Sequence, residues 1–259
     1  MKTNIAFIKM HGLGNDFVLV DNRNKPHDFS TKQIQHMGNR HTGIGFDQLI
    51  LINQAEDENC DANYQFFNPD GSQAEQCGNG QRCISAYLHT LDNKKNKFCV
   101  NGLAGKMYST CNPDATVTVD MGGIKSCRQI ENDKHLLYHV DFGNPHLVML
   151  QKNIQQSDLM QLHQQYSQQY KAGINLEIAE IINQNHIKIR VFERGTGETL
   201  ACGSGACAAF YALFWAKQLH NHVKVSLPGG QLVVEYHHEK QNIFLTGATT
   251  YVYSGEITL

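Results

Sequence analysis

The sequence lacks several patterns, and each absence narrows its function. Its 259 residues contain no Cys-x-x-Cys pair and no His-x₃-His pair near a cysteine, so a zinc site is not expected. Lysine and arginine form no run and the formal net charge is −2, which offers no electrostatic attraction to nucleic acid or to an anionic membrane. The longest apolar run, Ala206 to Ala216, is well short of the roughly 18 residues of a membrane helix. We expect no metal, nucleic-acid or membrane partner, and we interpret that run as a helix buried on all sides.

A signal peptide is also not expected. The apolar part of residues 1–9 is too short for one. Eight cysteines could make four disulfides in a secreted protein, but a chain of this length without a signal peptide is typical of a reducing compartment. We therefore predict thiols, most of them small core residues, in a cytoplasmic protein.

What the sequence does contain is one short motif written twice. Cys77-Gly78-Asn79-Gly80 and Cys202-Gly203-Ser204-Gly205 each run directly into an apolar helical stretch. A cysteine at a helix start faces unpaired N–H groups and the positive end of the helix dipole, and both favour the thiolate. The glycines let backbone amides approach a small anion such as a carboxylate. Two matched sites suggest a pair that works on one substrate.

Further landmarks repeat with the cysteines. Gly14-Asn15 lies 63 residues before the first cysteine and Gly143-Asn144 lies 59 before the second, and each precedes a predicted strand. Phe67 and Phe192 each lie ten residues before their cysteine. The cysteines are 125 residues apart, so this spacing predicts two units of like architecture. The expected domains are residues 1–120, completed by 248–259, and residues 121–247.

Hydrophobic patterning predicts an α/β (α+β) fold rich in strands. A polar, Gln-rich helix is expected from Ile154 to Tyr170, and a hairpin across Pro228-Gly229-Gly230. A short amphipathic helix is expected after Ser30-Thr31. Other strands are expected at 17–20, 48–52, 64–67, 98–100, 105–111, 115–119, 147–150 and 187–191, followed by a strand-rich tail that ends at Leu259.

Opposed cysteines suit acid–base chemistry at a stereocentre. A thiolate on one face of a tetrahedral carbon can remove a proton while a thiol on the other face returns one, which inverts the carbon. This needs no metal or redox cofactor if helix N-termini stabilise the developing charge. Nucleotide binding is not expected, because the glycine pattern at Gly203 lacks a strand leading directly into it and an acidic residue about twenty positions later.

Four separated blocks also resemble one family. His11 to Phe17, Asn68 to Ser72, Glu75 to Gly80, and Glu193 to Gly205 resemble diaminopimelate epimerase in content and order. The resemblance extends from Lys9 to Gly255 and implies two similar domains, each a curved sheet wrapped around a central helix, with the active site in the cleft between them. It implies a cofactor-independent epimerase that interconverts LL- and meso-2,6-diaminopimelate on the route to lysine and peptidoglycan.

The resemblance also assigns residues. Cys77 and Cys202 fall on the catalytic cysteines, and His146 on an auxiliary polar contact. Arg194 can fork onto a carboxylate, while Glu193 and asparagine oxygens can accept from ammonium groups. The expected partners are a small diamino-acid substrate and a second copy of the chain. The positions that fall on substrate contacts are Asn15, Gln48, Asn68, Gly78, Asn79, Asn144, Asn175, Glu193, Arg194, Gly203 and Ser204.

The sequence departs from the family pattern in two places and leaves alternatives open. The segment from Met121 to Asp141 is shorter than usual, and the residues around Asn175 lack the usual flanks. Proline or hydroxyproline racemase resembles the same twin-cysteine layout, although its residue two after the first cysteine is typically histidine and here is Asn79. Two other hypotheses for the function are a thiol-redox protein and a binding module without activity. The redox hypothesis is disfavoured because neither cysteine has an adjacent resolving cysteine.

Overall fold

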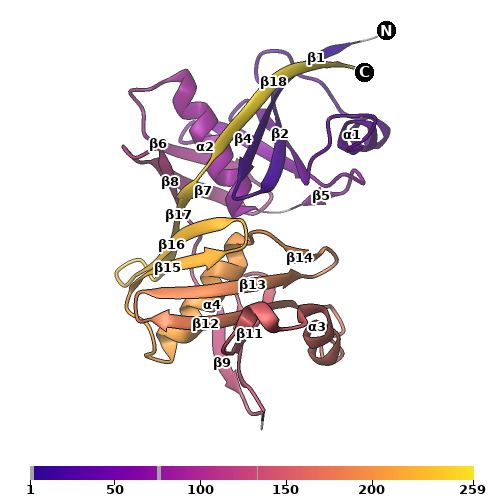
Figure 1. The fold of residues 1–259 in the computed structure, drawn as a ribbon. Coiled ribbons are helices and arrows are strands. Elements are labelled where there is room, and N and C mark those ends of the chain that lie inside the picture. Colours follow the sequence, from indigo (N-terminus) through magenta and orange to yellow (C-terminus); the bar gives the residue numbers. More distant parts are fainter. Residues whose placement is uncertain (1–2, 75–76, 133) are drawn as a thin grey trace. The chain divides into compact units, whose positions relative to one another are not determined.

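The computed structural model describes residues 3–74, 77–132 and 134–259. Within them the chain forms two compact units. Unit 1 runs up to Val119 and is completed by Ala248–Leu259, and unit 2 is Asp120–Gly247. Each unit combines a sheet with two α-helices, as the expected α+β class requires (Figure 1).

Unit 1 is built by strands around α2. Its β2 pairs in parallel with β3, and β4 pairs in parallel with β6, while the remaining neighbours are antiparallel. The C-terminal strand β18 pairs with β1 over most of its length. The elements are β1 (Asn4–Gly12), β2 (Asn15–Asp21), α1 (Thr31–Gly38), β3 (Gln48–Asn53), β4 (Ala62–Phe67), β5 (Gln73–Ala74), α2 (Gly78–Leu91), β6 (Lys97–Gly102), β7 (Gly105–Cys111), β8 (Thr116–Asp120) and β18 (Thr250–Thr258).

Unit 2 repeats that plan. Its parallel pairs are β11 with β12 and β13 with β15, and the antiparallel β9–β10 pair takes the place that β18–β1 has in unit 1. The elements are β9 (Ser126–Ile130), β10 (Leu136–Asp141), β11 (Pro145–Leu150), the 3₁₀ turn η1 (Ile154–Gln156), α3 (Leu159–Ser167), β12 (Asn175–Asn183), β13 (His186–Glu193), β14 (Gly197–Thr199), α4 (Gly203–Trp215), β15 (His222–Leu227), β16 (Gly230–His237) and β17 (Asn242–Ala248).

The central helix of unit 2 is buried because its side chains are small and apolar. Contacts join α4 to β9, β10, β11, β12, β13, β15 and β16, so strands surround it. The alanines of α4 and its Phe210 and Leu213 are fully buried, Ser204, Tyr211 and Phe214 are partly buried, and Trp215 at the C-terminal end is exposed. The prediction of a helix buried on all sides is confirmed except at that end.

The first helix of unit 1 is fixed by its cap. Ser30 accepts from the backbone N–H of Gln33, and the Gln33 side chain accepts from the N–H of Ser30, which together form a capping box. Ile34 and Met37 of α1 are buried against Val18, Val20 and Leu49 of the sheet. The short amphipathic helix predicted after Ser30-Thr31 is therefore confirmed.

The single helix predicted from Ile154 to Tyr170 is wrong. The chain forms η1, leaves helical geometry at Ser157, and restarts as α3, with Asp158 accepting from the N–H of Gln161 at 2.9 Å. Arg190 donates to the carbonyls of Ile154 and Ser157 at 2.7 and 2.9 Å. A long-range cation thus binds backbone acceptors that a continuous helix would have used, which local pattern cannot reveal.

Candidate active site

The first cysteine stands where α2 begins. Cys77 is the N-cap residue of α2, with extended backbone angles, and its Sγ accepts from the N–H of Gly80 at 3.5 Å. The same sulfur lies 3.5 Å from the side-chain oxygen of Asn15, to which a thiol can donate. The Gly80 bond suits the thiolate and the Asn15 bond suits the thiol. Cys77 therefore has a partner for each protonation state.

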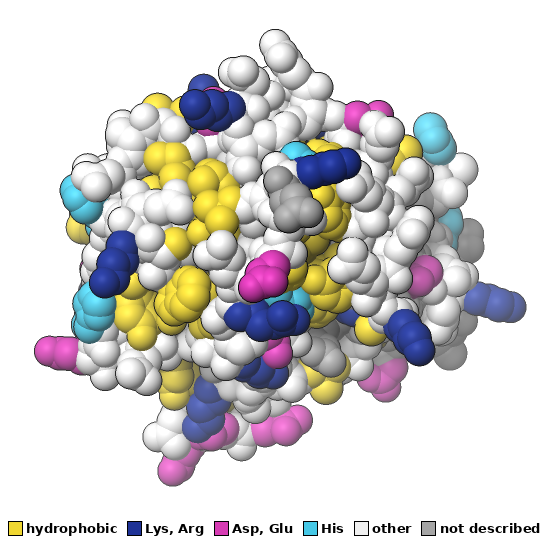
Figure 2. Space-filling view, turned by 90° about the horizontal axis from the view of Figure 1, so that it is seen from below, with side chains coloured by type: hydrophobic (Ala, Val, Ile, Leu, Met, Phe, Trp, Pro, Cys, Tyr) yellow, Lys and Arg dark blue, Asp and Glu magenta, His cyan; other side chains and the backbone are white. Residues whose placement is uncertain are grey.

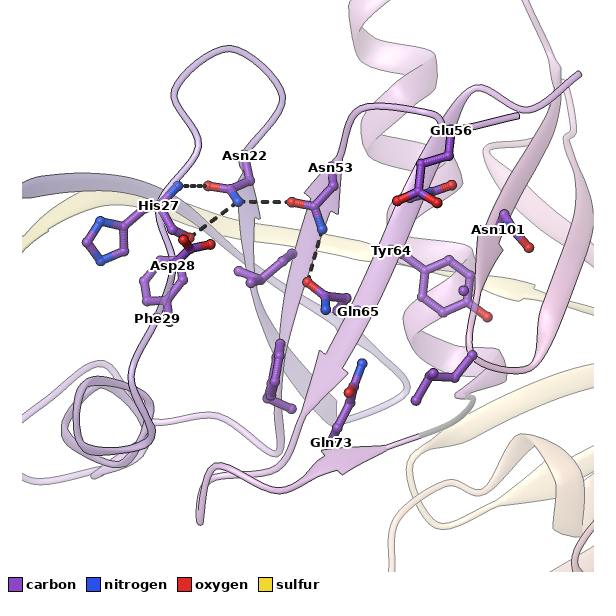
Figure 3. A pocket seen from close by; sticks show the side chains of 15 residues that line it. Asn22, His27, Asp28, Phe29, Asn53, Glu56, Tyr64, Gln65, Gln73 and Asn101 are labelled. Carbon is purple, nitrogen blue, oxygen red and sulfur yellow. Dashed lines mark hydrogen bonds between the residues drawn. The ribbon is translucent and has the colours of Figure 1, made fainter. Parts of the chain in front are cut away.

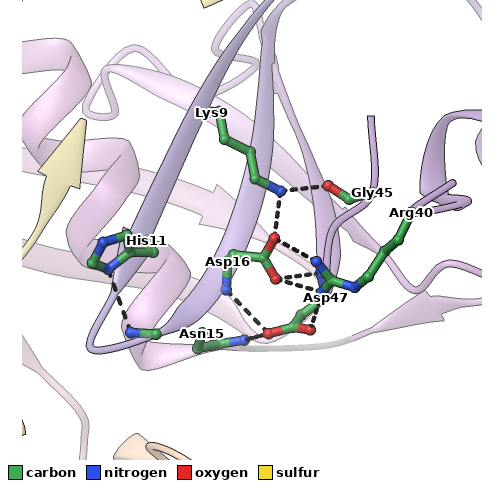
Figure 4. A network of polar contacts seen from close by, with 8 residues as sticks. Lys9, His11, Asn15, Asp16, Arg40, Gly45 and Asp47 are labelled. Atoms are coloured by element: carbon green, nitrogen blue, oxygen red, sulfur yellow. Dashed lines mark hydrogen bonds and ion pairs between the residues drawn. The ribbon is translucent and has the colours of Figure 1, made fainter. Parts of the chain in front are cut away.

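Asn15 is held from two sides. Its Oδ1 also accepts from Asn79 at 3.1 Å, and its Nδ2 donates to Asp47 at 2.9 Å. Arg40 links the carboxylate of Asp47 to that of Asp16, with Nη2 donating at 2.7 and 2.6 Å (Figure 4). Fixed at both ends of its amide, Asn15 has one orientation toward the sulfur.

The charge cluster behind Asn15 stays ionised. Burial opposes ionisation of Asp16, but hydrogen bonds from Arg40 and Lys9 outweigh it and lower the pKa of Asp16 to about 2. Lys9 also donates to the carbonyl of Gly45 (Figure 4). This network supports the amide of Asn15, which extends from it to the cysteine.

Two more predicted residues lie at the same end of the unit 1 sheet. Gln48 begins β3, and its Nε2 donates to the side-chain oxygen of Asn68, just after β4, at 3.3 Å. Asn68 in turn donates to Ser72 at 3.0 Å. Gly78 and Asn79 are buried in the first turn of α2. Of the first cysteine motif, Glu75 and Gln76 lie outside the described residues.

The second cysteine repeats the first. Cys202 is the N-cap residue of α4, and its Sγ accepts from the N–H of Gly205 at 3.3 Å. Ser204 Oγ lies 3.5 Å from the sulfur, and Gly203 is buried in the first turn. The Ser204 hydroxyl oxygen can accept from the thiol, and the carboxylate of Glu193 acts on the sulfur electrostatically. Cys202 thus also has a helix N–H donor and a separate oxygen acceptor.

Electrostatics keep this second sulfur protonated. Burial, followed by the carboxylates of Glu193 and Glu177, raises the pKa of the Cys202 thiol well above its ordinary value. Burial also raises the pKa of Glu193, although the hydrogen bond from Thr199 partly offsets it. Near neutral pH Cys202 is therefore a thiol, the form that donates a proton.

The remaining predicted residues of unit 2 surround Glu193. Asn175 is buried, and its amide donates to the carbonyl of Pro145 at 3.1 Å and accepts from the N–H of Arg194 at 2.9 Å. The Arg194 guanidinium donates to the carbonyl of Ala172 at 3.0 Å and is exposed. Both polar ends of the Asn175 amide thus bond to backbone, which makes it a brace for the Arg194 segment.

The predicted His146 has a partner that sequence reasoning missed. His146 and Glu177 are both fully buried, with Nδ1 and Oε1 2.7 Å apart. On its other side, His146 Nε2 lies 3.1 Å from Asn144 Oδ1. Glu177 lies between Leu176 and Ile178 in the sequence. This alternation of apolar and charged residues, taken alone, predicts that Glu177 faces solvent. In the structure both faces of β12 are covered: Leu176 and Ile178 pack with residues of α3, and Glu177 lies against Gly205 of α4.

Strand registers match the two units position by position. In unit 1 Phe17 pairs with Gln48 and Leu19 with Ile50; in unit 2 His146 pairs with Asn175 and Val148 with Glu177. The equivalences that follow are Asn15 with Asn144, Phe17 with His146, Gln48 with Asn175, Ile50 with Glu177, and Asn68 with Glu193. Predicted site residues from each unit therefore occupy equivalent places at the strand ends beside each cysteine.

A hollow of about 520 Å³ lies elsewhere on unit 1 (Figure 3). A row of amides crosses it, with Asn22 donating to Asn53 at 2.9 Å and Asn53 to Gln65 at 3.1 Å. No cysteine is among the described residues that line it. Because these amides bond one another and neither candidate cysteine lines the hollow, we do not place the reaction here.

Neither metal nor membrane features appear in the described part of the chain. It contains no group of three or more His, Cys, Asp or Glu side chains placed to hold a metal ion. None of its helices is both long and apolar enough to cross a membrane. On the face shown in Figure 2, lysine and arginine side chains are scattered among acidic and uncharged ones.

Solved structures with the same fold define the class of protein. A PhzF-family phenazine biosynthesis protein from Bacillus anthracis shares 16% identity and a TM-score of 0.74, covering 99% of this chain and 100% of that one. A hydroxyproline epimerase from Agrobacterium vitis shares 13% and 0.71, covering 99% and 91%. A methylitaconate-delta-isomerase shares 12% and 0.70, covering 100% and 96%. The chain has the two-domain fold of these proteins, and the expected fold class is confirmed.

The family follows from the sequence match. The model of the family described as diaminopimelate epimerase matches residues 7–126 and 138–252. The chain belongs to the diaminopimelate epimerase family and is an isomerase of the epimerase kind. The resemblance found in the sequence is confirmed, and substrate and mechanism are taken up as proposals.

Proposed function

We propose that the protein epimerises 2,6-diaminopimelate with Cys77 and Cys202 as a base and acid pair. One observation carries this proposal: each sulfur has an N–H donor at its helix mouth and a separate side-chain oxygen 3.5 Å away, Asn15 Oδ1 or Ser204 Oγ. A group that alternates between thiolate and thiol needs both partners. A cysteine that only packs in a core needs neither.

The reaction balances without any further reactant. A thiolate takes the α-proton, and the electron pair of the broken C–H bond stays on the substrate as a carbanion delocalised into its carboxylate. The opposite thiol then gives its proton to the other face of that carbon. The protein ends with thiol and thiolate exchanged, so the proposal requires the two sulfurs on opposite sides of one α-carbon. Backbone amides of Gly78, Asn79, Gly203 and Ser204 suit the reacting carboxylate.

The environments of the two cysteines suggest which isomer each one serves. Cys202 is held as a thiol by burial and nearby carboxylates, so it is the acid of the resting enzyme. Cys77 is then the base for the isomer whose α-proton faces it. Exchanging the two roles completes the reverse reaction.

Diaminopimelate fits these residues better than proline does. Glu193 can accept from an ammonium group of a diamino acid, and the exposed guanidinium of Arg194 can bind a second carboxylate. Asn79 stands where proline racemases typically carry histidine. None of the eight cysteines forms a disulfide, and all of them are in the described part, which fits a cytoplasmic enzyme.

Solvent-proton exchange tests the proposal directly. Purified protein is incubated with LL-diaminopimelate in heavy water, with chelator and without pyridoxal phosphate. Deuterium should enter the α-position as the meso isomer forms, and L-proline and 4-hydroxyproline serve as comparison substrates. Exchange into proline alone would assign the chain to the racemase branch. Activity lost with chelator and restored by one metal would refute the cofactor-free mechanism.

A further inference from the structure

One buried polar pair in unit 2 is not required by the fold. His146 and Glu177 lie beneath the first turn of α4, and both side chains are fully buried. The equivalent positions in unit 1 hold Phe17 and Ile50, which are fully buried as well. The same layer is therefore packed by two apolar side chains in one half and by an acid and a base in the other.

Burying such a pair is costly. Two ionisable groups lose their hydration, and their mutual bond often does not exceed what apolar side chains of similar size would contribute. The second carboxylate oxygen of Glu177 has no hydrogen-bond partner among the described residues, which adds to the cost. Because unit 1 fills the equivalent positions with apolar side chains, which cost less to bury, the fold alone does not explain the ionisable pair in unit 2.

Glu177, one member of the pair, lies close to Cys202. A Cβ placed on Gly205 would come within 2.7 Å of Glu177 Oε1 and 3.3 Å of Cys202 Sγ. The carboxylate and the sulfur are thus neighbours on either side of one glycine. On the far side of the imidazole, Nε2 lies 3.1 Å from Asn144 Oδ1. Glu177, His146 and Asn144 therefore form one chain of hydrogen bonds beside Cys202.

The direction of these bonds follows from the donors. The oxygen of Asn144 only accepts, so His146 Nε2 must carry a proton. A neutral imidazole protonated at Nε2 has a bare Nδ1, which requires a donor, and an imidazolium donates from both nitrogens. In either case one proton lies between Nδ1 and Glu177 Oε1, and the pair is neutral as a whole. Without a partner of this kind the tautomer of His146 is free to change.

From this geometry we infer that Glu177 is a positioning residue for the proposed epimerase reaction. It fixes the Nε2–H tautomer of His146, which holds the oxygen of Asn144 and leaves the Asn144 NH₂ group to face the substrate. The inference rests on the proposed function for its kinetic consequence. The tautomer itself is a property of the protein and is measured without substrate.

Three variants separate a donor from a charge. Glu177→Gln removes the charge but keeps an NH₂ donor to Nδ1, so the tautomer and kcat/KM should stay within about threefold of the parent. Glu177→Met conserves volume and removes the donor. It should lower kcat/KM by about 10- to 100-fold, the effect of a misdirected hydrogen bond to a charged substrate group. Glu180→Gln, on the same strand but partly exposed, is the matched control and should change neither.

The tautomer of the His146 imidazole distinguishes a positioning role of Glu177 from a packing role, because a change in packing alone would not alter it. ¹⁵N NMR of histidine-labelled protein at the pH of the assay should show His146 protonated at Nε2 in the parent and in Glu177→Gln. In Glu177→Met a substantial Nδ1–H population should appear. A parent His146 without a proton on Nε2 overturns the inference. So does a Glu177→Gln variant as impaired as Glu177→Met, because charge would then be what matters.

A second construction guards against a variant that fails to fold. The double change His146→Phe with Glu177→Ile copies the packing of unit 1, so it should fold with a melting temperature equal to or above that of the parent. Its kcat/KM should fall at least as far as that of Glu177→Met. Parental activity in this folded double variant would overturn the inference. If the parent exchanges no diaminopimelate proton, the proposed function fails while the NMR experiment still decides the tautomer.

Discussion

The Glu193 carboxylate is the strongest single influence on Cys202 after burial. It accepts from Thr199 at 2.5 Å, and it lies at the end of β13, at the position equivalent to Asn68 in unit 1. The position of Glu193 thus holds a carboxylate in unit 2 and a neutral amide in unit 1. A thiol near an anion is harder to ionise, which adds to the effect of burial on Cys202.

Removing that anion should make Cys202 ionise more easily. In Glu193→Gln the negative charge beside the sulfur is gone, so the thiolate is less unfavourable and the pKa of Cys202 should fall. The measurement is the rate of iodoacetamide labelling at Cys202 against pH, followed by peptide mass spectrometry, since only the thiolate reacts. The labelling curve should move to lower pH.

The control for this experiment comes from the neighbouring strand. Glu198 is exposed and pairs with Arg190 at 2.7 Å, so Glu198→Gln changes the charge of the chain equally without touching the sulfur. It should leave the labelling curve in place. A Glu193→Gln curve that stays put or moves to higher pH would show that burial alone protonates Cys202.

At the scale of single elements, the first turns of α2 and α4 decide where the cysteines point. Each turn has a glycine three residues after the cysteine whose N–H reaches the sulfur. A Cβ on Gly80 would come within 2.6 Å of the ring of Phe66 on β4, which is fully buried. The glycine therefore sets how closely α2 approaches the sheet.

Two opposing effects determine the outcome of Gly80→Ala. Alanine is favoured over glycine inside a helix by about 1 kcal/mol. Overpacking a rigid core costs about 1–3 kcal/mol, and the Phe66 ring has no room to withdraw. We expect net destabilisation by up to about 2 kcal/mol, measured by urea unfolding, together with reduced activity as Cys77 is displaced. Thr90→Ala, at the exposed end of the same helix, should change stability by less than about 0.5 kcal/mol. Equal stability of the two variants would contradict this packing argument.

How much the sequence could predict depended on how local each element is. The turn before each helix and the buried α4 follow from a few adjacent residues, so Cys77, Cys202 and their helices could be placed from the chain alone. The break between η1 and α3 could not, because Arg190 makes it from a distant strand. Glu177 was missed for a related reason: its burial depends on α4, a distant element that covers its face of β12.

At the scale of the whole molecule, the chain is one strand plan used twice with different residues at its strand ends. The duplication was visible in the spacing of Gly14-Asn15, Phe67 and Cys77 against their counterparts, because those landmarks are near the strands they precede. The differences between the two halves could not be seen in the sequence, because the strand registers are needed to match equivalent residues. Asn68 in unit 1 is equivalent to Glu193 in unit 2, and the apolar residues Phe17 and Ile50 are equivalent to His146 and Glu177. These differences fit separate roles for the two cysteines in the proposed reaction.

Separate roles predict separate defects in Cys77→Ser and Cys202→Ser. A serine hydroxyl is a far weaker acid than a thiol and supplies no ready base, so each change should lower epimerisation by about 10²–10⁴-fold. The two losses should not add in the double variant, because acid and base act as a unit. Each single variant keeps one competent sulfur, which can still remove a proton from the isomer that faces it. Elimination from a β-halogenated diaminopimelate analogue should therefore survive for one stereoisomer, and the two variants should prefer opposite ones.

Cys83→Ser, within the buried face of α2, is the control for loss of a thiol that no substrate meets. Full turnover by either single variant would refute the two-base assignment, and the same stereochemical preference in both would mean that the sulfurs do not act on opposite faces of the α-carbon.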